Sequence, residues 1–263
     1  MRIAVGLEYD GRDFCGWQHQ DHSPSVQAAV EKALSKVANE AVKVVCAGRT
    51  DTGVHAKEQV VHFDTQSVRS EHSWLMGCNA NLPKSVTVLW VKPVTDDFHA
   101  RYSAISRSYR YVILNRNSRP AYLRNLVTWD YRQLDTQRMH LAGQYLLGEH
   151  DFSSYRAVAC QSKTPVRTVT QLDVKRQGQI IVIDISANAF LHHMVRNVAG
   201  VLMAIGAGEQ DILWSRHVLE FRDRTLGGVT APPDGLYLSR VQYPTKFAIP
   251  EIDLEGVFPF SGI

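Results

Sequence analysis

The chain has 263 residues, 44% of them apolar, which is enough to bury a core in one large domain or two smaller ones. No basic segment followed by an apolar one opens the sequence, so a secretory signal is not expected. The longest stretch low in charge, residues 185–208, carries Arg196 at its middle and predicts a buried helix rather than a membrane span. Four scattered cysteines without a CxxC pair exclude a disulfide scaffold and indicate a cytoplasmic protein.

Charge is distributed unevenly along the chain. The net charge is +3, yet residues 101–132 hold seven arginines and one acid, Asp130, so this segment is +6 and the rest sums to −3. Six tyrosines and tryptophans interleave with these arginines. Guanidinium groups bind phosphate, and aromatic rings stack on unstacked nucleotides. The segment indicates structured RNA as the partner, the alternative being a strand with a solvated charged face.

Apolar periodicity in the first half of the chain predicts the element order strand, helix, strand, strand, helix, strand. The predicted strands cover residues 1–9, 42–46, 59–63 and 86–91. A first helix opens at Ser23-Pro24, and a second covers residues 70–78.

The second half shows a similar order. Strands are predicted over residues 108–114, 166–174, 180–185 and 236–241, with a hairpin turn around Gln177-Gly178. Helices are predicted over residues 136–147, ending at Gly148, and over 188–205 and 211–221. Twice βαββαβ predicts an α+β fold of two ferredoxin-like halves, with sheets that join and leave a central cleft. The expected domains are residues 1–104, residues 105–243 and a C-terminal tail, residues 244–263.

The segment "VCAGRTDTGVHA", Val45–Ala56, joins two of the predicted strands and places Arg49 two residues before Asp51. A plain hairpin connection explains the glycines and the aspartate, because both are turn residues, but it leaves Arg49 unexplained. Asp51-Thr52-Gly53 also spells the aspartic-protease triplet. That chemistry needs two carboxylates sharing a proton, whereas this chain has one such triplet and a nearby arginine that favours an ionised Asp51.

Other residue patterns exclude further kinds of site. His192-His193 does not predict a metal site, because adjacent residues on the predicted helix point about 100° apart. A single candidate carboxylate argues against a glycosidase, which needs a pair. No Walker loop or GxGxxG segment is present, so no nucleotide cofactor is expected.

Five segments carry a family resemblance. They are "GRTDTGVHA" (residues 48–56), "FHARYSAISRSYRY" (98–111), "ACQSKTPVR" (159–167), "FLHHMVRNVAGVL" (190–202) and "APPDGLYL" (231–238). Together and in this order they resemble the tRNA pseudouridine synthases of the TruA type over nearly the whole chain. The resemblance implies two α/β halves related by a pseudo-twofold axis, with the active site in the cleft between them.

The resemblance also implies an activity: cofactor-independent isomerisation of uridine to pseudouridine at positions 38, 39 and 40 of the tRNA anticodon stem-loop. It assigns Asp51 as the catalytic nucleophile, attacking either C1′ of the ribose or C6 of the base. Arg49 is matched to base flipping, and Tyr109, Arg196 and Leu236 to substrate binding.

The resemblance further implies tRNA contacts and an oligomeric state. The matched tRNA-binding residues are Phe98, His99, Ala100, Arg101, Tyr102, Ala159, Cys160, Gln161, Ser162 and Lys163. Family members are homodimers. We expect tRNA as the partner, neither a metal nor a membrane, and an ion pair between Arg196 and Asp51.

The alternative function is a tRNA-binding protein or RNA chaperone without catalysis on the same fold. A pure binder would not need a carboxylate beside anionic RNA, so the presence of Asp51 favours the enzyme. Both alternatives predict RNA binding that weakens steeply with salt.

Overall fold

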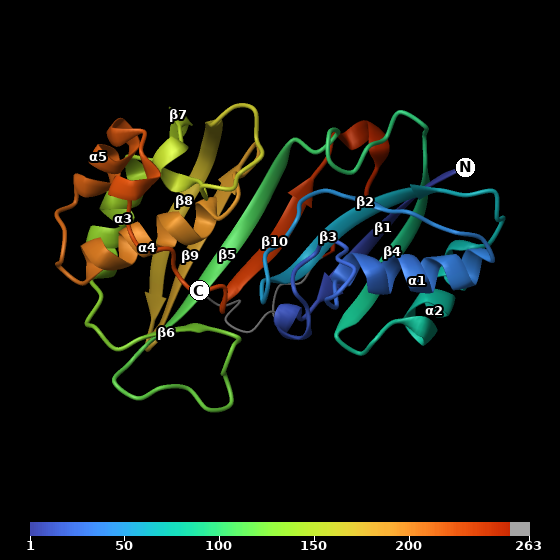
Figure 1. Ribbon diagram of the computed structural model, residues 1–263, viewed down its shortest axis with the longest axis horizontal. Coiled ribbons are helices and arrows are strands. Elements are labelled where there is room, and N and C mark those ends of the chain that lie inside the picture. The colour runs from blue at the N-terminus through green and yellow to red at the C-terminus, as the bar shows by residue number, and fades with distance from the viewer. Residues whose placement is uncertain (253–263) are drawn as a thin grey trace. The chain divides into compact units, whose positions relative to one another are not determined.

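A computed structural model describes residues 1–252 of the chain, in two compact units (Figure 1). Unit 1 comprises Met1–Ile105 together with the C-terminal segment that starts at Tyr237, and unit 2 comprises Ser106–Leu236. Each unit combines mostly antiparallel strands with helices that pack on them, so the predicted α+β class is confirmed.

Unit 1 contains the predicted βαββαβ order. Its elements are β1 (Arg2–Tyr9), α1 (Val26–Ala38), β2 (Val45–Cys46), β3 (His55–Asp64), α2 (Glu71–Asn81), β4 (Val86–Val94) and the later β10 (Leu236–Gln242). Strand β1 lies between β4 and β3 and is antiparallel to both. The other edge of β3 is shared, because β2 pairs antiparallel with its C-terminal part and β10 pairs in parallel with its start.

The first helix begins later than Ser23-Pro24, and the second predicted strand is shorter than residues 42–46. Ser25 caps α1, its hydroxyl accepting the Ala28 N–H at 3.3 Å. The strand is short because the N–H groups of Val42 and Val44 bond side chains of that helix, at 2.9 and 3.1 Å, instead of a neighbouring strand. Only Val45–Cys46 remains to form β2.

Within unit 2 the strands pair in the order β5–β9–β8–β7. Its elements are β5 (Ser106–Asn115), β6 (Thr128–Asp130), α3 (Thr136–Gln144), β7 (Gly148–Asp151), β8 (Val166–Gln177), β9 (Ile180–Ala187), α4 (Met194–Gly206) and α5 (Trp214–Phe221). The predicted hairpin is confirmed as β8 and β9, joined at Gly178 with φ 58°. Helix α3 packs on β8 and on α4 (Figure 1).

Two short strands of unit 2 were not predicted. β6 pairs in parallel with β5, and β7 pairs antiparallel with β8. Helix α3 stops at Gln144, three residues before the predicted end, because the chain must turn before Gly148 (φ 93°) opens β7. The pseudo-twofold relation, the joined sheet, the central cleft and the domain boundaries stay predictions.

The described part of the tail, from Pro244 on, packs against unit 1. Phe247 is buried and its ring lies 5.1 Å from that of Phe98, and Lys92 Nζ donates to the Ala248 carbonyl at 2.6 Å. The rest of the predicted tail, residues 253–263, lies outside the described residues. Among residues 1–252 no helix combines the length and the apolar character that a membrane crossing requires.

Candidate active site

The predicted hairpin connection is present in unit 1 as an eight-residue loop, residues 47–54, between β2 and β3. The Ala47 N–H donates to the Val60 carbonyl at 2.8 Å where the loop leaves β2. At its far end the Val54 N–H donates to the Asp51 carbonyl at 3.1 Å, around Gly53 with φ 78°. We call these residues the Asp51 loop.

A buried amide holds the start of the Asp51 loop. Gln59 on β3 is completely buried; its Nε2 donates to the Gly48 carbonyl at 2.6 Å and its Oε1 accepts the Gly48 N–H at 3.4 Å. The same Nε2 lies 3.4 Å from the Tyr9 hydroxyl. Because both backbone groups of Gly48 bond one rigid side chain, the approach to Arg49 is fixed from inside the core.

The middle of the Asp51 loop is held from the opposite side by residues 9–17. The Trp17 N–H donates to the Thr50 carbonyl at 3.0 Å, and the Thr50 hydroxyl bonds the Tyr9 hydroxyl at 2.8 Å. A Cβ on Gly16 would lie 2.8 Å from the Thr50 oxygen, so the two backbones touch. The sequence analysis missed these supports; the buried Trp17 beside a glycine is the signal that could have indicated them.

The loop therefore buries Thr50 and presents its two neighbours. Thr50 is 6% exposed, whereas Asp51 is partly exposed and Arg49 is exposed. A carboxylate and a guanidinium are therefore presented on either side of a residue that is fixed in the core.

A second arginine adds to the positive field near the Asp51 loop. Burial raises the pKa of the Cys46 thiol to about 12, while Arg49 and Arg101 both lower this pKa through their charge. The charges of both guanidinium groups therefore act on Cys46, the last residue of β2. Cys46 is an inert thiol at neutral pH, and the local charge favours an anionic partner.

The predicted RNA-contacting segment 98–102 alternates between core and surface. Phe98 and Ala100 are completely buried, whereas Arg101 is exposed and Tyr102 is 76% exposed. The His99 ring stacks on Tyr102 at 4.3 Å, and its Nδ1 accepts the N–H groups of residues 101 and 102. In this segment only His99, Arg101 and Tyr102 present side chains at the surface, so the prediction of RNA contacts concerns these three side chains.

Unit 2 carries three of the other predicted residues. Tyr109 on β5 is 8% exposed and meets the Phe190 ring edge-on at 5.0 Å. Arg196 lies in the first turn of α4, where its Nε donates to the Ala231 carbonyl at 2.8 Å. Leu236 opens β10 and is buried.

The helix face around Arg196 is buried rather than solvated. Ala199 and Met203, its neighbours on that face, are buried. The segment before β10 covers them: the Ala231 N–H donates to the Arg196 carbonyl at 3.1 Å, and a Cβ on Gly200 would lie 1.8 Å from the Val229 oxygen. The backbone carbonyl and the side chain of Arg196 thus both hydrogen-bond Ala231, which fixes the segment that leads to Leu236.

The prediction that His192 and His193 are helical is wrong. Helix α4 begins at Met194, after His193 with φ 61°, and the two rings lie 4.1 Å apart. The preceding residues are extended because Asn188 bonds the backbone of Thr168 in both directions and the His192 carbonyl accepts the Ala157 N–H. Helix geometry is therefore no reason to reject a metal at these two histidines.

The second predicted RNA-contacting segment, residues 159–163, is a surface connection of unit 2. Ala159, Gln161 and Lys163 are exposed, and Cys160 and Ser162 are half-buried. Arg167 Nη2 donates to the Ser162 hydroxyl at 2.7 Å, which ties the segment to β8. Unit 1 thus holds Arg49, Asp51 and residues 98–102, and unit 2 holds the remaining predicted residues.

Comparison with known proteins shows to which family the chain belongs. A family model described as tRNA pseudouridine synthase matches residues 7–103 and 142–244. A protein of Nitrosococcus oceani is 62% identical over 252 residues, covering 96% of this chain and 97% of its own. Proteins of Alcanivorax borkumensis (56% over 251 residues, 95% and 94% covered) and Coxiella burnetii (54% over 257 residues, 98% of both) are also similar.

All three relatives are named tRNA pseudouridine synthase A. Among solved structures, a Cbf5–Nop10–Gar1 complex matches 76% of this chain and 45% of its own at 12% identity, with a TM-score of only 0.32. The chain belongs to the tRNA pseudouridine synthase family. It is therefore an enzyme of the isomerase class.

Proposed function

We propose that the protein converts uridine to pseudouridine at positions 38, 39 and 40 of the tRNA anticodon stem-loop, with Asp51 as the nucleophile. Family membership supports the reaction class. The single observation that carries the assignment to Asp51 is the construction of its loop, in which Gln59 and Thr50 are fixed in the core while the carboxylate reaches solvent. A turn that only reverses the chain does not need this support.

The reaction exchanges one bond to the ribose for another. The bond between C1′ and N1 of uracil breaks, the base turns, a bond between C1′ and C5 forms, and the proton on C5 is replaced by one on N1. Nothing is added or released, so the reaction needs no redox cofactor or nucleotide. A covalent adduct of Asp51, at C1′ or at C6, divides this exchange into two easier steps.

The other residues prepare the substrate. The target uridine must leave its stack, at a cost of a few kcal/mol, and Arg49 takes the vacated space. Tyr109 stacks on the turned-out base and takes part in the later proton transfer, and Leu236 lines the pocket. Residues 98–102 and 159–163 bind the tRNA, and the protein acts in the cytoplasm as a homodimer.

Arg196 is proposed to pair with Asp51 through their opposite charges. We expect Arg196→Gln to form pseudouridine more slowly than the wild type. Activity equal to that of the wild type would exclude the pair.

The test compares the wild-type protein with Asp51→Asn on an unmodified tRNA transcript with uridines at positions 38 to 40. Pseudouridine is read as carbodiimide-dependent stops in primer extension, and tRNA binding is measured in parallel. We expect stops with the wild type and none with the variant, at similar affinity. Binding by both proteins without stops at any uridine would instead identify an RNA-binding protein without catalysis.

A further inference from the structure

The connection between β5 and β6, residues 116–127, is the most basic surface segment of unit 2 outside the predicted site. With the two residues that follow it, it contains three arginines, Arg116, Arg119 and Arg124, and no acidic residue. Figure 1 shows it as a long loop that projects beyond the ends of the unit 2 strands. It lies in residues 104–141, which the family model does not match.

The charges of this loop are not neutralised by the described part of the protein. Arg119 and Arg124 are exposed, and within residues 1–252 neither has an ion-pair partner. Arg116 bonds neutral oxygens, its Nε donating to the Ser118 carbonyl at 2.8 Å and its Nη2 to the Arg119 carbonyl at 3.4 Å. Three positive charges therefore face solvent without a carboxylate, which favours an anionic ligand.

Arg132, just beyond β6, serves as a contrast. Its guanidinium is ion-paired with Asp130 and, at 2.7 Å, with Glu209, and these partners raise its pKa. This arginine is structural. Among the described residues, the loop arginines lack such partners.

Exposed aromatic rings stand beside these arginines. Tyr122 is 83% exposed, Tyr131 66% and Trp129 40%, and the rings of Trp129 and Tyr131 lie 6.0 Å apart. Contiguous exposed apolar patches mark interaction sites. Rings among arginines fit nucleic acid, in which bases stack on aromatics and phosphates bind guanidinium groups.

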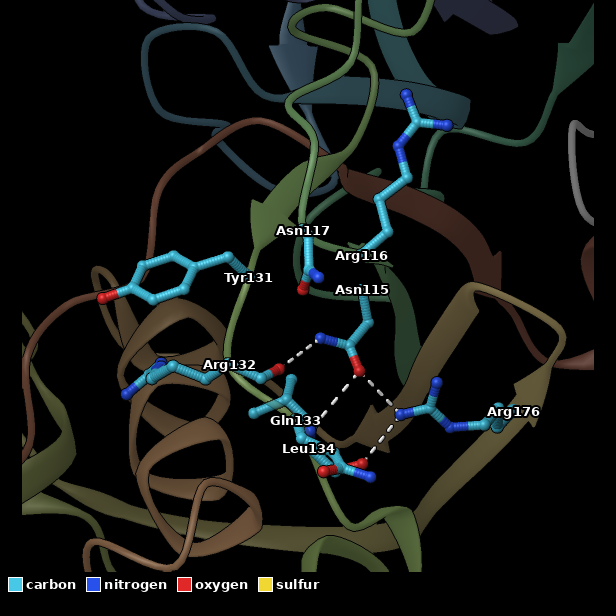
Figure 2. A pocket seen from close by; sticks show the side chains of 8 residues that line it. All are labelled: Asn115, Arg116, Asn117, Tyr131, Arg132, Gln133, Leu134 and Arg176. Carbon is cyan, nitrogen blue, oxygen red and sulfur yellow. Dashed lines mark hydrogen bonds between the residues drawn. The ribbon is translucent and has the colours of Figure 1, made fainter.

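Hydrogen bonds fix the base of the loop. Figure 2 shows the Asn115 amide donating to the Arg132 carbonyl at 2.6 Å and accepting from Arg176 Nη2 at 2.8 Å. Arg176 also donates to the Leu134 carbonyl at 2.7 Å. These bonds enclose a cavity of about 390 Å³ beside Tyr131. The Arg116 guanidinium points away from Arg176 in this view, so the charges form an open surface rather than a closed ion pocket.

The surface lies far along β5 from the predicted base-binding residue. Tyr109 and Asn115 are six residues apart on that strand, or about 20 Å at roughly 3.3 Å per residue. A single uridine cannot reach both places. A ligand that contacts both places must be extended. Since the loop is positively charged, this ligand must also be anionic.

We infer that residues 116–124, with Tyr122, Trp129 and Tyr131, form a second RNA-binding surface, which holds backbone phosphates of the same tRNA at a distance from the target uridine. This inference rests on the proposed function for the identity of the RNA. The loop arginines bind phosphates, and the exposed rings stack on nucleotides that are not paired.

The test measures tRNA binding and pseudouridine formation by Arg119→Gln/Arg124→Gln. Neither side chain bonds another described residue, so the fold should be unaffected, and equal melting temperatures would verify this. We expect the Kd for tRNA to rise about tenfold near 0.1 M salt, with kcat at saturating tRNA within about twofold of wild type. The slope of log Kd against log salt should fall by about 1.5 to 2, as two phosphate contacts are lost.

The matched control is Lys32→Gln/Lys36→Gln, which removes two exposed charges from α1. Its affinity and salt slope should stay close to wild type. Tyr122→Ala should weaken binding without changing the salt slope, because stacking releases no counterions.

Two results separate this inference from the proposed function. If the wild type forms pseudouridine and the loop variant binds no more weakly than the α1 variant, the second surface is excluded and the function stands. If the wild type forms no pseudouridine while the loop variant still has a higher Kd for tRNA and a smaller salt slope, the second surface is supported and the proposed function is excluded.

Discussion

Gly16 and Gly178 both adopt positive φ, 90° and 58°, but only Gly16 touches the Asp51 loop. A Cβ on Gly16 would lie 2.8 Å from the Thr50 oxygen, whereas a Cβ on Gly178 would meet nothing within 4 Å. We expect Gly178→Ala to cost about 1 kcal/mol of unfolding free energy from backbone strain alone. Gly16→Ala should cost roughly 2–4 kcal/mol and lower kcat at least about tenfold, because Thr50 must move and carries Asp51 with it.

Urea unfolding and single-turnover pseudouridine formation, measured on both variants, check this comparison. Gly178→Ala controls for the strain of a side chain at positive φ. Should Gly16→Ala keep wild-type kcat while losing stability, the contact with Thr50 would be structural only and the position of Asp51 would not depend on it.

At the scale of residues, the sequence singles out candidate reacting groups but not their supports. Arg49 and Asp51 stand out because a turn has no use for an arginine between glycines. Gln59 carries no such signal, and Gly16 carries only that of its neighbour Trp17. Each acts on a backbone group of a segment distant in the sequence, Gln59 on Gly48 and Gly16 on Thr50. Such contacts follow from tertiary packing, which a local pattern does not encode.

At the scale of elements, β3 carries two buried titratable side chains on one face, Glu58 and His62. Burial raises the pKa of Glu58 to about 7; Arg240 lowers this pKa and Glu251 raises it, by smaller amounts. Burial also lowers the pKa of His62 to about 4. The neutral ring of His62 accepts the Ala100 N–H at 3.1 Å, which anchors residues 98–102.

The two groups change stability in opposite directions. In the folded state Glu58 holds its proton above its usual pKa of 4.5, so its contribution is greatest below that pH and is lost as pH rises to about 7. His62 sheds its proton below its usual pKa of 6.5, so its contribution is present above 6.5 and lost as pH falls to about 4. The combined pH dependence between pH 4.5 and 6.5 is partly cancelled.

Glu58→Gln isolates the carboxyl group. Relative to this variant, we expect the wild type to lose roughly 2–3 kcal/mol of unfolding free energy between pH 4.5 and pH 7.5. Urea unfolding of both proteins at several pH values measures the difference. Parallel curves for the two proteins would mean that Glu58 ionises normally in the folded chain.

The predicted bounds agree with the structure for elements that apolar periodicity defines. They disagree where hydrogen bonds of polar side chains determine where an element starts or ends. Strands β1, β4, β5, β8 and β9 and helix α2 follow their patterns closely. The pattern of α4 extends back to residue 188, yet the helix starts at Met194 because Asn188 bonds β8 instead. Strand β7 reads Gly-Glu-His-Asp, which has no alternation, and forms only because β8 offers an edge.

At the scale of the whole molecule, the chain leaves unit 1 after Ile105 and returns to it at Tyr237. The returning strand β10 pairs in parallel with the start of β3, Tyr237 opposite His55 and Leu238 opposite Ala56. The Tyr237 ring stacks on the His55 ring at 4.6 Å, with 20° between the planes. His55 directly follows the Asp51 loop. Strand β10, which lies far along the sequence, therefore contributes to the support of this loop.

Tyr237→Ala should therefore damage both stability and catalysis, whereas Tyr237→Phe should spare both. Tyr237 is 8% exposed, and truncation of a buried aromatic costs about 3–5 kcal/mol, whereas loss of the hydroxyl alone costs about 1 kcal/mol. With the ring gone, His55, which directly follows the Asp51 loop, loses its stacking partner, so kcat should fall while the KM for tRNA changes little. Urea unfolding and steady-state kinetics of the two variants decide the matter: a Tyr237→Phe variant as impaired as Tyr237→Ala would show that the hydroxyl, not the stacked ring, joins the returning strand to the Asp51 loop.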